Sequence, residues 1–83
     1  RWLRASLGDT VQMIPVEDID YLRADEKYTS VAWQDADGAA RESLLRMPLK
    51  DVLAQLDPEQ FAQVHRSVAV NLAAVSHLVR SEH

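Results

Sequence analysis

The sequence contains no cysteine, which excludes disulfide bonds, thiolate nucleophiles and cysteine-built zinc sites. It has only two glycines, which leaves little material for the glycine-rich loops that hold phosphates in nucleotide-binding enzymes. No apolar run approaches the roughly 20 residues of a membrane helix, and the opening residues lack a signal-peptide pattern. We therefore expect a cytoplasmic protein without a membrane partner.

The 83 residues predict one domain with a modest core, because a chain of this size buries about 60% of its unfolded surface. The composition, 47% hydrophobic and 27% charged, is typical of a folded globular domain. The net charge of −4 disfavours a nucleic-acid partner when taken alone, because phosphate binding usually needs a basic surface. Acidic residues gather in the first half, however, and a local basic face could still form from Arg41, Arg46, Lys50 and Arg66.

Alternation of apolar and polar residues predicts strands in the first half of the chain. Residues 1–7 alternate and stop at Gly8-Asp9, a pair suited to a tight turn, before alternation resumes over 10–16. Pro15 lacks an amide hydrogen and therefore belongs at the edge or end of a strand. Next we expect a short link, a strand, an exposed charged loop at 24–27 and another strand, which the turn signal at 35–38 joins to a further strand.

Only one segment has helical spacing. Its apolar stripe predicts a helix of about two to three turns and consists of Leu49, Val52, Leu53 and Leu56. Pro48 suits the first helical turn, and Asp57-Pro58 provides a stop. The later sequence is largely apolar, and residues 74–80 resemble one more strand. The predicted fold is mainly β with one short α-helix.

The histidines are the main candidates for enzymatic chemistry, since they could act with carboxylates in acid–base catalysis. His83 is terminal, and His77 stands alone in an apolar segment. No HExxH pair or nucleophile elbow is present, and the acid pairs lack EF-hand spacing. We expect no enzyme, no metal site and no cofactor.

The few aromatic residues have two interpretations. Four of them alternate with polar residues and are expected in the core or in cross-strand pairs: Trp2, Tyr21, Trp33 and Phe61. Tyr28 instead lies in a polar stretch beside Lys27 and Thr29. That stretch is either a solvated loop or a loop tip that offers a cation, a phenol and a hydroxyl to a polar partner.

His65 and Arg66 interrupt the apolar segment 61–75. The Arg66 guanidinium is always charged, and its planar fork of donors matches guanine O6 and N7 or two phosphate oxygens. The alternative is a salt bridge from Arg66 to Glu59 or Asp57, with His65 capping a turn. Composition alone does not separate these two interpretations.

The order of features resembles the LytTR family, the DNA-binding output domain of many bacterial two-component response regulators. One part of the match is VEDIDYLRADEKYTSVAW at 16–33, with its acidic pair, aromatic residue and polar loop. The other part, at 41–75, contains FAQVHRSVAVN, which is similar to the family's Phe-x-x-Val-His-Arg-Ser and Val-Asn run. The resemblance covers nearly the whole chain, and this second run is its specific part.

The resemblance implies an elongated stack of antiparallel sheets in which loops, not a recognition helix, enter the grooves of duplex DNA. Arg66 would contact bases, and the first DNA-facing loop would present Lys27, Tyr28 and Thr29. Phosphate-contacting or supporting roles fall to Arg46, Lys50, His65 and Ser67. Asn71 would stabilise the turn after the motif. We expect apolar neighbours to anchor Arg66 from both sides, namely Phe61, Val64, Val68 and Val70.

The resemblance also bears on the limits of the domain. The family continues with a final hairpin and a further DNA-contacting loop, so we expect the domain at 1–83 to be C-terminally truncated relative to it. A missing hairpin exposes a sheet edge, which favours a homodimer or strand-exchanged oligomer. An upstream receiver domain is expected in the full-length protein. The alternative function is a β-rich module that pairs with a protein partner through an exposed sheet edge.

Overall fold

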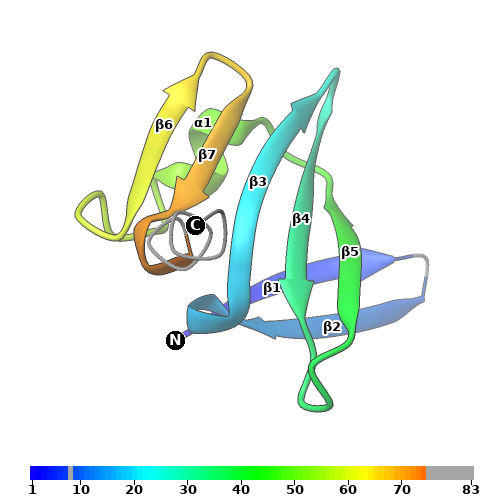
Figure 1. Ribbon diagram of the computed structural model, residues 1–83. Helices are drawn as coiled ribbons and strands as arrows, with labels where there is room; N and C mark the ends of the chain where they lie inside the picture. The colour runs from blue at the N-terminus through cyan, green and yellow to red at the C-terminus, as the bar shows by residue number, and fades with distance from the viewer. Residues whose placement is uncertain (8, 75–83) are drawn as a thin grey trace.

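The protein contains two antiparallel sheets in the computed structural model, which describes residues 1–7 and 9–74 (Figure 1). β1 (Trp2–Leu7) and β2 (Thr10–Pro15) form a separate hairpin. The larger sheet has the strand order β5-β4-β3-β7-β6, and its strands are β3 (Ile19–Asp25), β4 (Tyr28–Gln34), β5 (Ala40–Leu45), β6 (Phe61–His65) and β7 (Val68–Asn71). The predicted mainly β, antiparallel fold is confirmed.

Most strand boundaries follow the sequence signals. Pro15 is the last residue of β2, and a 3₁₀ turn, η1 (Val16–Asp18), forms the expected link. The loop predicted at 24–27 is shorter, because Asp25 pairs with Tyr28 and leaves only Glu26 and Lys27 in the turn. Glu26 has a φ of 53°, a left-handed conformation that a non-glycine residue adopts at a small energetic cost.

The helix is also shorter than predicted. α1 (Leu49–Leu53) has five residues and is preceded by Pro48 in an extended conformation. The apolar stripe is nevertheless real, because Leu49, Val52 and Leu56 are buried. Residues 72–74 are helical as well, including the first residue of the strand expected at 74–80; the rest of that strand lies outside the described residues.

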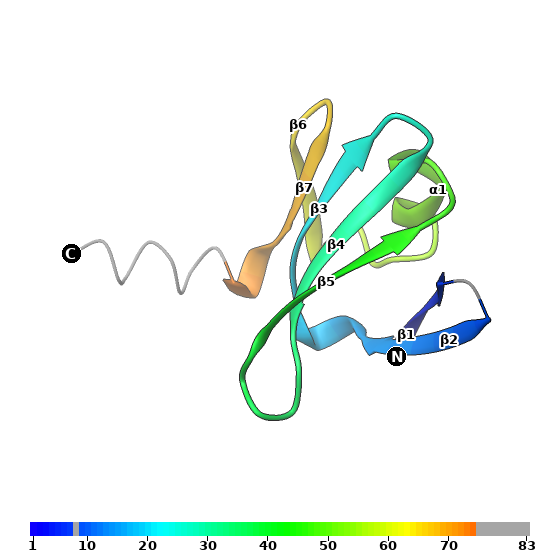
Figure 2. The same ribbon diagram turned by 90° about the vertical axis from the view of Figure 1, so that its right-hand side faces the viewer.

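The core lies on one face of the five-stranded sheet, which α1 and the β1–β2 hairpin cover from the same side (Figure 2). The hairpin contributes Leu3, Ala5 and Ile14 to this core. Trp33 and Phe61 are buried in the core, whereas Trp2 and Tyr21 are exposed and fit only the other expected position, in cross-strand pairs with Pro15 and with Ala32 and Val70. Successive side chains of a strand point to opposite faces of the sheet. The faces that carry Trp2 and Tyr21 have no covering layer among the described residues.

A buried polar chain joins the two sheets. The indole of Trp33 donates to the Ser43 hydroxyl at 3.0 Å, and that hydroxyl donates to the side-chain oxygen of Gln12 at 2.7 Å. Such a chain satisfies polar groups that would otherwise be costly to bury. It fixes β2 against β4 and β5.

The β4–β5 turn is organised by one carboxylate. Asp35 accepts hydrogen bonds from the backbone amides of Asp37 and Ala39 and from the Arg41 guanidinium, at 2.9, 3.0 and 2.8 Å. Gly38 supports the turn with a φ of 79°. The hydrogen bond from Arg41 is the main cause that lowers the pKa of Asp35 below its ordinary value of 3.8.

This turn should be sensitive to acid. Because the folded-state pKa of Asp35 is lowered, its contribution to stability is present above about pH 4 and is lost as the pH falls through the folded-state pKa. Asp35→Ala should lower the melting temperature slightly at pH 7, and the difference from wild type should vanish in strong acid. Thermal melts over this pH range measure the effect; a difference that persists unchanged at the acidic end would contradict it.

Candidate nucleic-acid interface

The β3–β4 and β6–β7 turns lie at the same end of the molecule (Figure 1). β3 and β7 are neighbours in the sheet, with Arg23 opposite Val68. Beyond this last pair, the amide of Ala24 donates to the carbonyl oxygen of Ser67 at 2.7 Å. A main-chain hydrogen bond therefore holds the two turns at a fixed separation.

Side chains also close the β6–β7 turn from within. The Gln63 amide donates to the carbonyl oxygen of Arg66 at 3.0 Å. The ring nitrogen Nδ1 of His65 accepts from the Ser67 amide at 3.2 Å and lies 2.9 Å from the Ser67 hydroxyl. Both contacts hold the His65 ring against Ser67, two residues further along the chain. His65 therefore caps this turn, as one of the two interpretations predicted.

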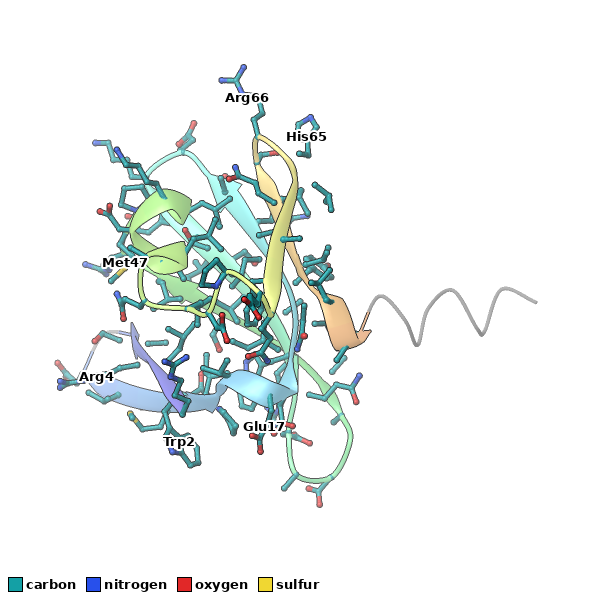
Figure 3. The ribbon with its side chains drawn as sticks, turned by 90° about the vertical axis from the view of Figure 1, so that its left-hand side faces the viewer. Trp2, Arg4, Glu17, Met47, His65 and Arg66 are labelled. Atoms are coloured by element: carbon teal, nitrogen blue, oxygen red, sulfur yellow. The ribbon has the colours of Figure 1, made fainter. Side chains whose placement is uncertain are left out.

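Arg66 is exposed at the tip of this turn, and its side chain extends away from the protein (Figure 3). Within residues 1–7 and 9–74 it forms no salt bridge. The alternative interpretation, a salt bridge to Asp57 or Glu59, is therefore not met, and the Asp57 carboxylate accepts from the Glu59 amide at 2.9 Å. Among the described residues, the guanidinium donates to no side chain or carbonyl, which leaves its donors facing solvent.

The prediction that apolar neighbours anchor Arg66 is only partly correct. Phe61 is buried and Val68 and Val70 are half-buried, but Val64 is 63% exposed. Val64 lies three residues after the buried Phe61, so the alternation of β6 turns it to the opposite, outward face. Hydrogen bonds within the turn, more than packing, therefore fix the backbone of Arg66.

The first predicted loop separates into exposed and buried parts. Lys27 is exposed in the turn, and Tyr28, the first residue of β4, is 39% exposed. Thr29 is fully buried, so its predicted position in an exposed loop is wrong. Its hydroxyl donates to the Met47 carbonyl oxygen at 2.8 Å. Thr29 thus ties β4 to the segment between β5 and α1 and is not available for direct contact.

The other basic residues that were predicted to contact DNA lie near the same end of the molecule as the two turns. Leu45 pairs with Thr29, so Arg46 follows β5 close to the β3–β4 turn, and Lys50 lies in α1; both side chains are exposed. Arg41 is separate from them, because its salt bridge with Asp35 holds it at the opposite end of the sheet.

Charge is therefore unevenly spread over the fold. Acidic residues of η1 and of the β4–β5 turn lie at the end far from the paired turns, at Glu17, Asp18, Asp35 and Asp37. Lys27, Arg46, Lys50 and Arg66 belong to the elements that meet at the near end, although Asp25 and Glu26 are there too and Arg4 and Arg41 lie elsewhere. A net charge of −4 consequently does not prevent a locally basic surface.

Sequence reasoning missed Gln63 and the main-chain bond between Ala24 and Ser67. A glutamine in an alternating strand carries no sequence signal for a bond to a carbonyl three residues later. The Ala24 bond depends on β3 and β7 being neighbours, a pairing between segments more than 40 residues apart. The one available hint was the His-x-Ser spacing, which permits a side-chain cap over the intervening residue.

No catalytic arrangement is found in the described part of the chain. Residues 1–7 and 9–74 contain no group of three side chains suited to hold a metal ion. A shallow hollow beside β5 contains Arg23 and Glu42, which pair at 3.6 Å, while Ser30 donates to the same carboxylate at 2.6 Å. His77 and His83 lie outside the described residues. None of the described helices has the length and apolar character required to cross a bilayer.

Comparison with known proteins agrees with this geometry. The chain is 42% identical over 79 residues to an uncharacterized response regulatory protein of Vibrio cholerae, and 36% identical over 69 residues to the CO-responsive transcriptional regulator RcoM of Rhodospirillum rubrum. These alignments cover 95% and 83% of the chain but only 30% and 27% of the relatives, so the chain spans less than a third of their lengths.

A solved structure and a family model give the same result. A LytTr DNA-binding domain from Bacillus cereus superposes with a TM-score of 0.71 at 22% identity, covering 87% of this chain and 62% of that one, which shows a shared fold. The family model described as the LytTr DNA-binding domain matches residues 9–83. The chain therefore belongs to the LytTR family of DNA-binding domains.

Proposed function

We propose that this chain is the sequence-specific, duplex-DNA-binding part of a bacterial transcriptional regulator that acts in a two-component system. Family membership supports DNA binding, and the name of the Vibrio cholerae relative, a response regulatory protein, supports the two-component role. The regulator would be non-enzymatic in this part, and its longer form would carry the receiver domain. The observation that carries the proposal is Arg66, exposed at the tip of a turn whose backbone is held by hydrogen bonds.

The Arg66 guanidinium is proposed to read a base edge. Its two parallel N–H groups match O6 and N7 of guanine, a contact that discriminates by about 1–3 kcal/mol against a wrong base. The bonds from Gln63 and within the His65–Ser67 pair order the backbone before DNA arrives. Less conformational entropy is then lost on binding, and more of the contact energy is available for discrimination.

The surrounding residues are proposed to position the duplex. Lys27, Arg46 and Lys50 would neutralise phosphates, which sets the register without reading sequence. The Nε2–H of His65 and the phenol of Tyr28 are further hydrogen-bond donors for the phosphate backbone of the DNA. Ser67 and Thr29 would act indirectly, because their hydroxyls are already bonded to His65 and Met47.

A titration against selected and scrambled duplexes at two salt concentrations tests the function. With few phosphate contacts and a negative total charge, we expect weak binding to scrambled duplex, lost quickly as salt rises, and stronger binding to the selected one. Equal affinity for both duplexes would contradict sequence-specific reading. The edge-pairing alternative predicts no binding to either duplex.

Lys27→Ala should weaken binding to every duplex by a similar factor. A lysine that neutralises one phosphate contributes about 0.9 to the slope of log K against log salt concentration, so that slope should fall by about one. Binding isotherms at four or more salt concentrations give the slope. A loss confined to one base position would instead show that the β3–β4 turn reads sequence.

A further inference from the structure

The outward face of the β1–β2 hairpin is apolar and uncovered among the described residues. Trp2, Val11 and Met13 are 60%, 50% and 49% exposed, and register places all three on the same side as Pro15. The opposite side supplies Leu3 to the core. Single exposed apolar side chains are common, but these three share one face of a small hairpin with Pro15 and with the polar Arg4 and Ser6, and such a grouping indicates a contact surface.

This face does not belong to the proposed DNA interface. Trp2 lies at one end of the molecule and Arg66 at the other (Figure 3). The hairpin therefore stays accessible when the two turns engage a duplex.

Two opposite charges flank Trp2 along this face. Arg4 lies two residues after Trp2 along β1, towards the hairpin turn. Glu17 lies on the other side, two residues past Pro15, which is the cross-strand partner of Trp2. The order Arg4, Trp2, Glu17 is seen along the edge in Figure 3. Within residues 1–7 and 9–74, neither Arg4 nor Glu17 forms a salt bridge.

We propose that this face binds a second copy of the chain about a two-fold axis close to Trp2. In a two-fold contact the same patch occurs on both subunits. Every contact between one residue of the first copy and another residue of the second copy therefore occurs twice. An axis at Trp2 brings Arg4 against the partner's Glu17 on both sides and apposes the two indole rings. An axis displaced to the level of Arg4 and Met13 would oppose like charges and is disfavoured.

The small size of the face determines how strong this contact is. A handful of side chains falls well below the roughly 800 Å² per partner of a stable interface, so the association is weak and transient. It becomes effective where two copies are held close together, as on neighbouring DNA sites, because the local concentration is then high. The two pairs of opposite charges set the register, and the Trp2 and Pro15 side chains beside the axis supply the apolar attraction.

Sedimentation of the chain without DNA tests the contact independently of the proposed function. We expect a monomer at about 10 µM and a rising dimer fraction towards about 1 mM. Trp2→Ser should abolish the dimer while the melting temperature stays near that of wild type, since most of this side chain is exposed. A chain that remains monomeric throughout, or a dimer insensitive to Trp2→Ser, would overturn the proposal.

A charge exchange tests the two-fold register. Arg4→Glu alone and Glu17→Arg alone should each weaken the dimer at least about fivefold, whereas the double variant should restore it to within about twofold, because opposite charges then meet again. Glu59→Arg, which reverses an exposed charge on another part of the surface, is the matched control and should have no effect. Failure of the double variant to recover the dimer would rule out the axis at Trp2.

Discussion

Arg66→Ala should reduce affinity for the preferred duplex by roughly 5- to 150-fold, which corresponds to losing about 1–3 kcal/mol of base discrimination. Affinity for scrambled duplex should fall much less, so the preference itself largely disappears. Stability should stay within about 0.5 kcal/mol of wild type, because Arg66 is exposed and forms no salt bridge within residues 1–7 and 9–74. Competition titrations and thermal melts on the same preparations measure both quantities.

Two matched variants separate base reading from simple attraction. Arg66→Lys keeps the charge but loses the planar fork, so it should recover binding to scrambled duplex without recovering the preference. Arg41→Ala removes an arginine from the far end of the sheet and should leave both affinities unchanged. Full recovery of preference by lysine would mean that Arg66 contacts a phosphate, and unfolding of Arg66→Ala would show that its role is structural.

The strands were predictable because their signals are local. Alternation located β1 and β2, and the position of Pro15 set the end of β2, whereas Gly8 of the expected turn lies outside the described residues. The helical stripe was recognised for the same reason, although α1 ends earlier than the pattern of Leu53 and Leu56 indicates. Local chemistry thus gives the type of each element better than its length.

Errors arose where the deciding contact is distant in sequence. Thr29 looked like a loop residue because charges surround it, yet pairing with Ala24 and Leu45 places it in the middle of the sheet. Val64 was expected to anchor Arg66 together with Phe61, but it lies three residues after Phe61 and therefore on the opposite, exposed face of β6. The exposure of Trp2 depends on which side of its hairpin meets the core, a choice that alternation alone leaves open.

Net charge was the least informative quantity about the candidate site. Part of the total of −4 comes from acidic residues in η1 and in the β4–β5 turn, far from the two tied turns, whereas Asp25 and Glu26 lie beside Lys27. Electrostatic attraction to a duplex depends on the charges within about one Debye length, roughly 8–10 Å, of the phosphates. Lys27 and Arg66 are held at a fixed separation by the bond between Ala24 and Ser67, so their effect survives the unfavourable total.

Asn71→Asp should be the most destabilising of the substitutions discussed, although it is nearly isosteric. Asn71 is buried, and its amide donates to the Ile19 carbonyl oxygen at 2.8 Å while its side-chain oxygen accepts from the Ala73 amide at 3.1 Å. The first bond satisfies a carbonyl beside the irregularity between Ile19 and Tyr21, and the second caps residues 72–74. Together they match the predicted stabilising role of Asn71 after the motif.

Aspartate keeps the acceptor for Ala73 but loses the donor to Ile19. In its ionised form it places a buried negative charge against a carbonyl oxygen, so we expect a loss of about 3 kcal/mol and a fall in melting temperature of roughly 10 °C or more at pH 7. Asn71→Ala loses both bonds without adding charge, and its cost should be about 1–3 kcal/mol at every pH.

The pH dependence distinguishes the two variants. Burial and the Ile19 carbonyl should raise the folded-state pKa of the introduced carboxyl above its unfolded value of about 3.9, because both disfavour the charged form. Asn71→Asp should therefore approach wild-type stability below about pH 4, where the protonated acid can donate to Ile19, and lose stability as the pH rises through its folded-state pKa. Melts of both variants and wild type from pH 3 to 8 measure this, and a penalty for Asn71→Asp that does not change with pH would show that ionisation of the introduced carboxyl is not its cause.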